Sequence, residues 1–139
     1  MFYPKHMEKT YTISGVAGRT GVSIDTLRYY ERIELIHGVG RLSNTHRRYT
    51  ESDIQWIQFL LKLRATGMSI QQMLVFARLR RLGESTLCER AAILKAHHDQ
   101  VEAHVQQMQE YLVVLDYKIT LYESTLLARD AGKGEEIEP

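Results

Sequence analysis

Residues 13–33 have the sequence ISGVAGRTGVSIDTLRYYERI, and this stretch decides the fold of the first half of the chain. Ile13 and Val16 fall on one face of a short helix, which Gly21 ends because glycine tolerates the backbone of a tight turn. Ser23 is a favoured N-cap for a second helix. Two short helices joined by a tight turn predict a helix-turn-helix motif.

The spacing of apolar residues changes after this motif. Between Leu35 and Tyr49 the helical period fails, and Gly38 and Gly40 favour turns. We expect residues 47–49 to form the return strand of a short hairpin, a wing beside the helix-turn-helix. Residues 1–10 are expected to form a loose lead-in.

A pair of helices is predicted after the wing. Thr50 is a suitable cap for the first of them, with Asp53 three residues later in a capping-box arrangement. Gly67 ends this helix, and Ser69 begins the next one, which is expected to end near Gly83.

A heptad pattern dominates the chain from residue 86 onward. Apolar or semi-apolar residues recur at alternating steps of four and three, with no Pro or Gly among them. These seam residues are Leu87, Ala91, Leu94, His98, Val101, Val105, Met108, Leu112, Leu115, Ile119, Tyr122 and Leu126. A helix over residues 86–128 would be about 60 Å long, and the rest of the chain supplies no helix of that length to cover its stripe. The pattern therefore predicts a homodimer.

Charge is divided unevenly along the chain. Residues 1–80 carry twelve Lys and Arg against six acids, a net charge of +6, whereas residues 81–139 carry six against eleven, a net charge of −5. A basic half joined to an acidic half is typical of a protein that binds a polyanion such as double-stranded DNA through one part and a protein partner through the other.

These patterns together predict a mainly α protein with three parts. Residues 10–83 are expected to form a winged helix-turn-helix DNA-binding domain that includes the helix pair. Residues 86–128 are expected to form a coiled-coil dimerisation helix, and residues 129–139 a flexible acidic tail.

Composition excludes several classes of protein. The single cysteine, Cys88, rules out an intrachain disulfide, and no apolar run reaches the roughly 18 residues that span a membrane. The N-terminus lacks the apolar stretch of a signal peptide, so we expect a cytoplasmic protein without membrane contact. The sequence contains no Gly-rich phosphate loop, metal-ligand cluster or nucleophile motif, which argues against an enzyme and predicts no cofactor and no metal site.

Three short motifs resemble a known family. Leu27-Arg28-Tyr29-Tyr30-Glu31, Arg47-Arg48-Tyr49 and Gly67-Met68-Ser69, in this order, resemble the MerR family of bacterial transcription regulators. The resemblance implies a homodimer bound to a palindromic promoter site whose two polymerase elements lie too far apart. An effector then makes the dimer bend and untwist this DNA for RNA polymerase. Family members pair their long helices antiparallel, an orientation that this sequence alone leaves open.

The candidate DNA contacts lie on the second helix and on the wing. Thr26 and Arg28 are the candidates for contact with base edges, because the N-terminal part of a recognition helix enters the major groove. By the resemblance, a tyrosine and three wing arginines contact phosphates. These residues are Tyr29, Arg41, Arg47 and Arg48.

Each of these assignments has a plainer alternative. For Arg28 and Tyr29, the alternative is a solvated helix face without DNA contact. For Arg47 and Arg48, the alternative is that one of them pairs with an acid such as Glu51. Arg19 and Lys62 suit a solvated face as well as a phosphate contact. Tyr30 is expected to point inward, because it lies on the side of Leu27.

The signal that operates the regulator is expected to be a small-molecule or redox effector of unknown identity. Short chains of the aldehyde- and thiol-stress branch, which this sequence resembles, often carry a reactive cysteine in the third helix, but that position is Lys62 here. Cys88 is either a sensor of oxidants and electrophiles or a cysteine without such a role. The helix N-terminus and Arg90 would favour its thiolate in the first case.

His98 is the one strongly polar residue of the seam. A buried polar residue at such a position selects helix register or orientation at a cost in stability. Our hypothesis is that His98 contributes to pairing specificity or to a pH response; the alternative is a histidine at the edge of the seam that reaches water.

Two other functions share these features. One is an effector-independent repressor or DNA-organising protein. The other is a coiled-coil adaptor whose helix-turn-helix binds protein, although the basic first half favours a polyanion.

Overall fold

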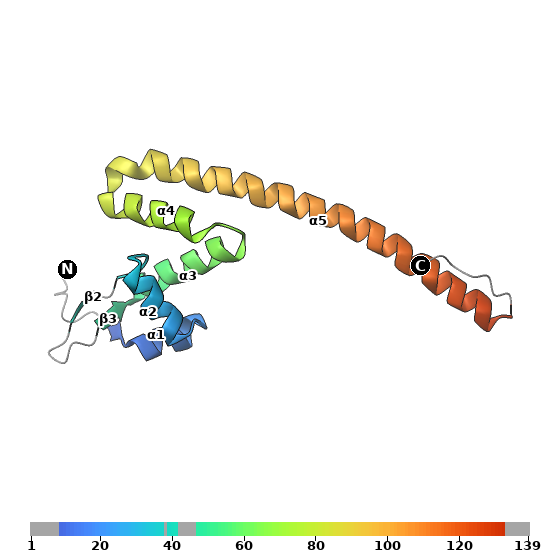
Figure 1. Ribbon diagram of the computed structural model, residues 1–139, viewed down its shortest axis with the longest axis horizontal. Coiled ribbons are helices and arrows are strands. Elements are labelled where there is room, and N and C mark those ends of the chain that lie inside the picture. Colours follow the sequence, from blue (N-terminus) through green and yellow to red (C-terminus); the bar gives the residue numbers. More distant parts are fainter. Residues whose placement is uncertain (1–8, 38, 42–46, 133–139) are drawn as a thin grey trace. The chain divides into compact units, whose positions relative to one another are not determined.

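The computed structural model describes residues 9–37, 39–41 and 47–132 (Figure 1). Its elements in chain order are β1 (Thr10–Tyr11), α1 (Ile13–Thr20), α2 (Ile24–Arg32), β2 (Val39–Arg41), β3 (Arg47–Thr50), α3 (Glu51–Ala65), α4 (Ile70–Leu82), the 3₁₀ turn η2 (Glu84–Thr86) and α5 (Leu87–Asp130). The chain divides into two units within α5, after Leu94. The predicted fold class is confirmed: the chain is mainly α, with a winged helix-turn-helix, a helix pair and a long last helix.

Local capping bonds define the helix-turn-helix formed by α1 and α2. Gly21 adopts the left-handed conformation with φ 75°, and its N–H donates to the Ala17 carbonyl at 2.9 Å, which ends α1. Ser23 Oγ accepts the Thr26 N–H at 3.1 Å and begins α2. These bonds confirm the predicted turn and N-cap. Each bond joins residues close in sequence, so the sequence alone was enough to predict both features.

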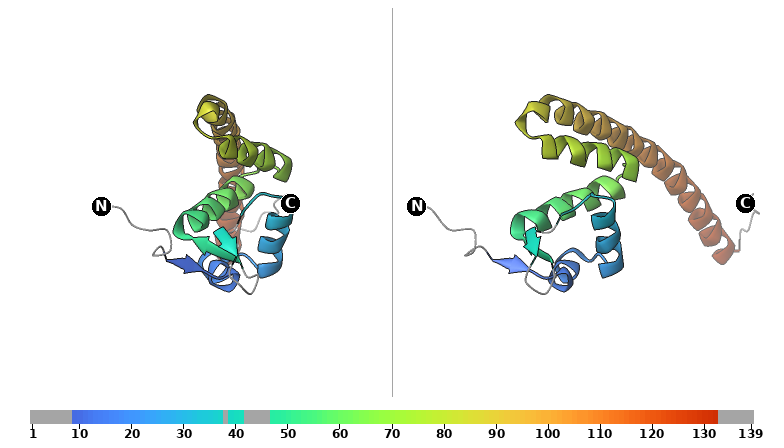
Figure 2. Two further views of the ribbon diagram at one scale, coloured as in Figure 1. Left: turned by 90° about the vertical axis from the view of Figure 1, so that its left-hand side faces the viewer. Right: turned by 60° about the vertical axis from the view of Figure 1, so that its left-hand side comes forward.

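The wing belongs to a three-stranded antiparallel sheet with the strand order β1-β3-β2. The sheet contacts α1 and α3 through β3 (Figure 2). The predicted hairpin is confirmed by β2 and β3, while residues 42–46 between them lie outside the described residues. The prediction that residue 10 belongs to a loose lead-in is wrong, because Thr10 pairs with Thr50. A two-residue strand shows no alternation in the sequence, and its partner lies far along the chain.

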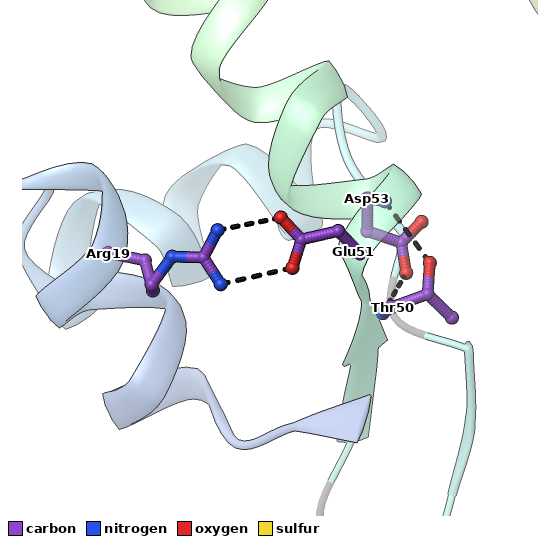
Figure 3. A network of polar contacts seen from close by, with 4 residues as sticks. All are labelled: Arg19, Thr50, Glu51 and Asp53. Carbon is purple, nitrogen blue, oxygen red and sulfur yellow. Dashed lines mark hydrogen bonds and ion pairs between the residues drawn. The ribbon is translucent and has the colours of Figure 1, made fainter. Parts of the chain in front are cut away.

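Thr50 ends β3 and begins α3 through two reciprocal hydrogen bonds (Figure 3). Its Oγ1 accepts the Asp53 N–H at 3.1 Å, and the Asp53 carboxylate accepts the Thr50 N–H at 2.8 Å. The predicted capping box is therefore confirmed. Ser69 and Gln72 form the same arrangement at the start of α4.

An apolar cluster holds the helices of the first unit together. Its most completely buried side chains are Val16, Leu27, Leu35, Ile36, Tyr49, Ile54, Ile57, Leu60 and Met73. Trp56, Phe59 and Phe76 form an aromatic group between α3 and α4, with ring centroids 6.0 to 6.2 Å apart. Helices α1 to α4 and the sheet thus share one core.

The long helix α5 comprises 44 residues, none of which is buried. Near its start, Ile93 and Leu94 pack partly against the core of the first unit, so one residue of the predicted seam already has a partner in its own chain. Farther along, Leu112 and Leu115 are 55% and 56% exposed. The helix continues to Asp130, into the stretch 129–139 that was predicted as a tail. No helix in the described residues is long and apolar enough to cross a membrane.

Replacing Thr50 with Ala removes the accepting hydroxyl of the capping box, and we expect the free energy of unfolding to fall by about 1 kcal/mol. Ser52→Ala is the matched control, because Ser52 is exposed in the same turn and its side chain makes no hydrogen bond within the described part of the chain. Urea unfolding followed by circular dichroism measures both. Equal unfolding midpoints would show that the capping box does not stabilise α3.

Candidate DNA-binding surface

Helix α2 has one buried and one exposed side. Leu27 is fully buried in the core and Tyr30 is 7% exposed, which confirms that Tyr30 points inward. Arg28 and Tyr29 are exposed, Tyr29 by 41%. The burial of two residues of α2 therefore directs the two residues between them outward, as a recognition helix requires.

Neighbouring side chains orient the candidate contacts on α2. The Ser23 hydroxyl donates to Thr26 Oγ1 at 2.9 Å, which leaves the Thr26 hydroxyl its own proton to donate. The Arg32 guanidinium lies 5.8 Å from the centre of the Tyr29 ring. Thr26 and Tyr29 are thus held by contacts within the helix and its cap.

The wing arginines lie on the strands β2 and β3. The backbones of Arg41 and Arg47 lie in β2 and β3, but their side chains lie outside the described residues. Arg48 is half-buried, and its guanidinium donates to Thr10 Oγ1 at 3.1 Å and to the Thr10 carbonyl at 3.4 Å. Arg48 therefore joins β3 to β1, and any phosphate contact would share its guanidinium with Thr10.

Glu51 was considered above as the partner of a wing arginine, and it pairs with Arg19 of α1 (Figure 3). Two guanidinium nitrogens of Arg19 donate to the two carboxylate oxygens of Glu51 at 3.0 and 2.6 Å. The hydrogen bonds from Arg19 lower the pKa of the Glu51 carboxyl, and those same bonds raise the pKa of Arg19. This bidentate pair fastens α1 to the first turn of α3.

Two further bonds hold the last turn of α2 and the segment that follows it. The Tyr49 hydroxyl on β3 donates to the Glu31 carboxylate. The Trp56 indole N–H on α3 donates to the Leu35 carbonyl at 3.1 Å. Sequence reasoning missed these contacts because each joins residues of different elements. The Arg47-Arg48-Tyr49 motif indicated that β3 is part of the wing. It did not show that Tyr49 is buried and bonds to Glu31 of α2.

Comparison with known proteins agrees with this geometry. The family model described as MerR HTH family regulatory protein matches residues 11–73. An uncharacterised HTH-type transcriptional regulator of Haemophilus influenzae is 34% identical over 114 residues, which cover 82% of this chain and 84% of that protein. The chain belongs to the MerR family.

Solved structures of family members resemble most of this MerR-family regulator. HiNmlR, described as a MerR family regulator lacking the sensor domain and bound to promoter DNA, has a TM-score of 0.79 and 33% identity, over 89% of this chain and 96% of that one. A MerR-family protein of Listeria monocytogenes has a TM-score of 0.81 and 36% identity, over 88% and 92%. Family members are transcriptional regulators, so this chain is a regulator rather than an enzyme.

The candidate sensor residue Cys88 lies on a different helix from the candidate DNA contacts. Cys88 is exposed in the first turn of α5. The guanidinium of Arg90, which was expected to favour its thiolate, donates to Thr86 Oγ1 at 3.0 Å and to the Gly83 carbonyl at 3.2 Å. Lys62 is exposed on α3. Among the residues that the structure describes, no group of three or more His, Cys, Asp or Glu is arranged to hold a metal ion.

His98 lies among acids on α5. Its Nδ1 is 3.2 Å from the Asp99 carboxylate, and its Nε2 is 3.8 Å from that of Glu102. Both ring nitrogens of His98 thus face a carboxylate of its own helix. The role of His98 in pairing stays a prediction.

The Arg19–Glu51 pair makes stability depend on pH. Because folding lowers the pKa of Glu51, the pair stabilises the protein above the ordinary glutamate pKa, and this contribution is lost as the pH falls through the lower folded value. We therefore expect Glu51→Gln to be less stable than wild type at neutral pH, with the difference shrinking on acidification. Unfolding midpoints measured across the acid range test this.

The control for this prediction is Glu110→Gln. Glu110 is exposed on α5 and has no ion pair within the described residues, so its replacement should leave the acid dependence unchanged. The difference in unfolding midpoint between wild type and Glu51→Gln should change with pH. If that difference stayed constant at every pH, the pair would not contribute to the pH dependence of stability.

Proposed function

We propose that this MerR-family regulator binds a palindromic promoter site in double-stranded DNA as a homodimer and regulates transcription there. The observation that carries the proposal is the orientation of α2, which buries Leu27 and Tyr30 and exposes Arg28 and Tyr29. The likeness to a regulator that is bound to promoter DNA supports it.

The proposed contacts divide into two classes. Arg28 and Thr26 contact base edges in the major groove, since an arginine there is able to bind a guanine through two hydrogen bonds. Tyr29 and the wing arginines Arg41, Arg47 and Arg48 contact phosphates on either side. The buried face of α2 sets the direction from which the helix approaches the groove.

The homodimer is proposed to form through α5. The exposed apolar side chains of the seam lie at heptad spacing, and a second copy of the same helix is able to cover them. Seam residues at least 48% exposed in the single chain are Leu87, Val105, Met108, Leu112, Leu115, Ile119 and Leu126. Such exposure over a long helix is typical of a surface that a partner covers.

The dimer is proposed to activate by distorting an overlong promoter spacer for RNA polymerase when an effector binds. Long helices suit this mechanism, because they keep two reading heads at a set distance while the DNA is bent at a cost of about 1–6 kcal/mol. Such a protein would work in the cytoplasm of a bacterium. Cys88 is the proposed sensor if the effector is an oxidant or electrophile, since it is an exposed thiol.

An effector-independent repressor is the second candidate. The likeness to a regulator described as lacking the sensor domain, yet bound to promoter DNA, favours it. Both candidates require the same DNA contacts and differ only in whether an effector changes transcription from the bound promoter.

Arg28→Ala should weaken binding to the palindrome by about 1–3 kcal/mol, because a bidentate base contact is lost. Footprinting on the DNA upstream of the regulator's own gene locates the palindrome, and fluorescence anisotropy then measures affinity for it and for a scrambled sequence. Arg78→Ala is the control, because it removes the same charge from an exposed site on α4. Equal losses for the two variants, or no protected palindrome, would contradict the proposal.

Val105→Glu should convert the dimer to monomer, because the substitution places like charges in the seam near the middle of α5. Gln106→Glu, one residue along, adds the same charge outside the seam and should leave the dimer intact. Sedimentation equilibrium distinguishes the two states. A dimer that survives Val105→Glu would show that the heptad stripe is not the interface.

A further inference from the structure

The segment Ile33–His37 joins the recognition helix α2 to the wing strand β2, with residue 38 between them outside the described residues. Glu34 in this segment has φ 65°, a left-handed conformation that is uncommon for any residue but glycine. Leu35 and Ile36 are buried, and their N–H groups donate to the Tyr30 carbonyl at 2.9 and 3.4 Å. The Glu34 N–H also donates to the Glu31 carbonyl at 3.0 Å, so this backbone is a left-handed cap that ends α2. A non-glycine residue adopts this conformation at a cost in free energy, and contacts from other elements are able to offset that cost.

One such contact comes from α4. A single guanidinium nitrogen of Arg81, Nη1, donates to the Glu34 carbonyl at 2.7 Å and lies 3.1 Å from His37 Nε2. Because Nη1 carries two protons, it is able to serve both acceptors when His37 Nε2 is unprotonated. Arg81 thus grips the segment at the strained residue and again at its last described residue.

A parallel contact comes from α3. The Trp56 indole donates to the Leu35 carbonyl at 3.1 Å. Arg80, beside Arg81 on α4, lies 4.2 Å from the centre of the Trp56 ring, and the ring of Phe76 stacks against Trp56 at 6.0 Å. Successive residues of α4 therefore act on the same segment, Arg81 directly and Arg80 through Trp56.

We propose that Arg81 is a positioning residue for DNA binding, which holds Glu34–His37 and so fixes the wing relative to α2. It contacts no DNA itself and acts through the backbone of the segment. The inference rests on the proposed function, because it assigns the wing to phosphate contact. It also gives α4 a physical route to the wing, since the Arg81 contacts join the last turn of α4 to the chain that leads into β2.

Salt dependence separates positioning from phosphate contact. Arg81→Ala should weaken binding to the palindrome about fivefold, the effect of one hydrogen bond of about 1 kcal/mol. The slope of log affinity against log salt should stay at its wild-type value. Loss of a phosphate contact lowers that slope by about 1 instead. Arg78→Ala, an exposed arginine one turn earlier on α4, controls for the lost charge and should keep wild-type affinity.

A double-mutant cycle tests whether Arg81 and His37 act together. The Arg81→Ala His37→Ala double variant should bind no more weakly than Arg81→Ala alone, because the arginine variant already removes the shared contact. Additive losses, or a lowered salt slope for Arg81→Ala, would overturn the proposal.

Amide hydrogen exchange in the free protein tests the contact without DNA. The Leu35 and Ile36 amides should exchange faster in Arg81→Ala than in wild type, while Arg78→Ala leaves them unchanged. If wild type binds no palindrome, the proposed function fails, yet faster exchange would still support the hold on the segment. Unchanged exchange in Arg81→Ala overturns the inference whatever the DNA result.

Discussion

The burial of Leu27 and Tyr30 on α2 is the constraint on which the candidate DNA-binding surface depends. Leu27 lies in the core with Val16 and Tyr49, so α1, α2 and β3 are joined by the same apolar contacts. A helix of nine residues is too short to be stable alone, and its packing against this core supplies the stability. The same packing decides that Arg28 and Tyr29 face outward.

Polar contacts between side chains orient the elements that the apolar core packs together. The Arg19–Glu51 pair joins α1 to α3, and the Tyr49 hydroxyl joins β3 to the end of α2. Exposed ion pairs contribute little to stability, so the Arg19–Glu51 pair serves mainly to orient two elements that are already packed.

Much of the fold was predictable because its signals are local. Gly21 ends α1 through its own backbone, and Thr50 with Asp53 begins α3 within three residues, so a reader of the sequence finds both. The strand β1 was not predictable, since two residues show no period and Thr10 bonds to a distant strand. Arg48 was predicted as a phosphate contact from the family resemblance, and its bonds to Thr10 were visible only in the folded chain.

The sequence by itself determined the order of the elements, the capped starts of α2, α3 and α4, the heptad stripe of α5 and the membership in a regulator family. All of these follow from residue spacing or from short motifs. Only the tertiary structure decided that Glu51 pairs with Arg19, that Tyr49 is buried, and that Arg81 reaches Glu34. Those contacts join residues far apart along the chain, and their partners are chosen by how the helices pack rather than by any pattern in the sequence.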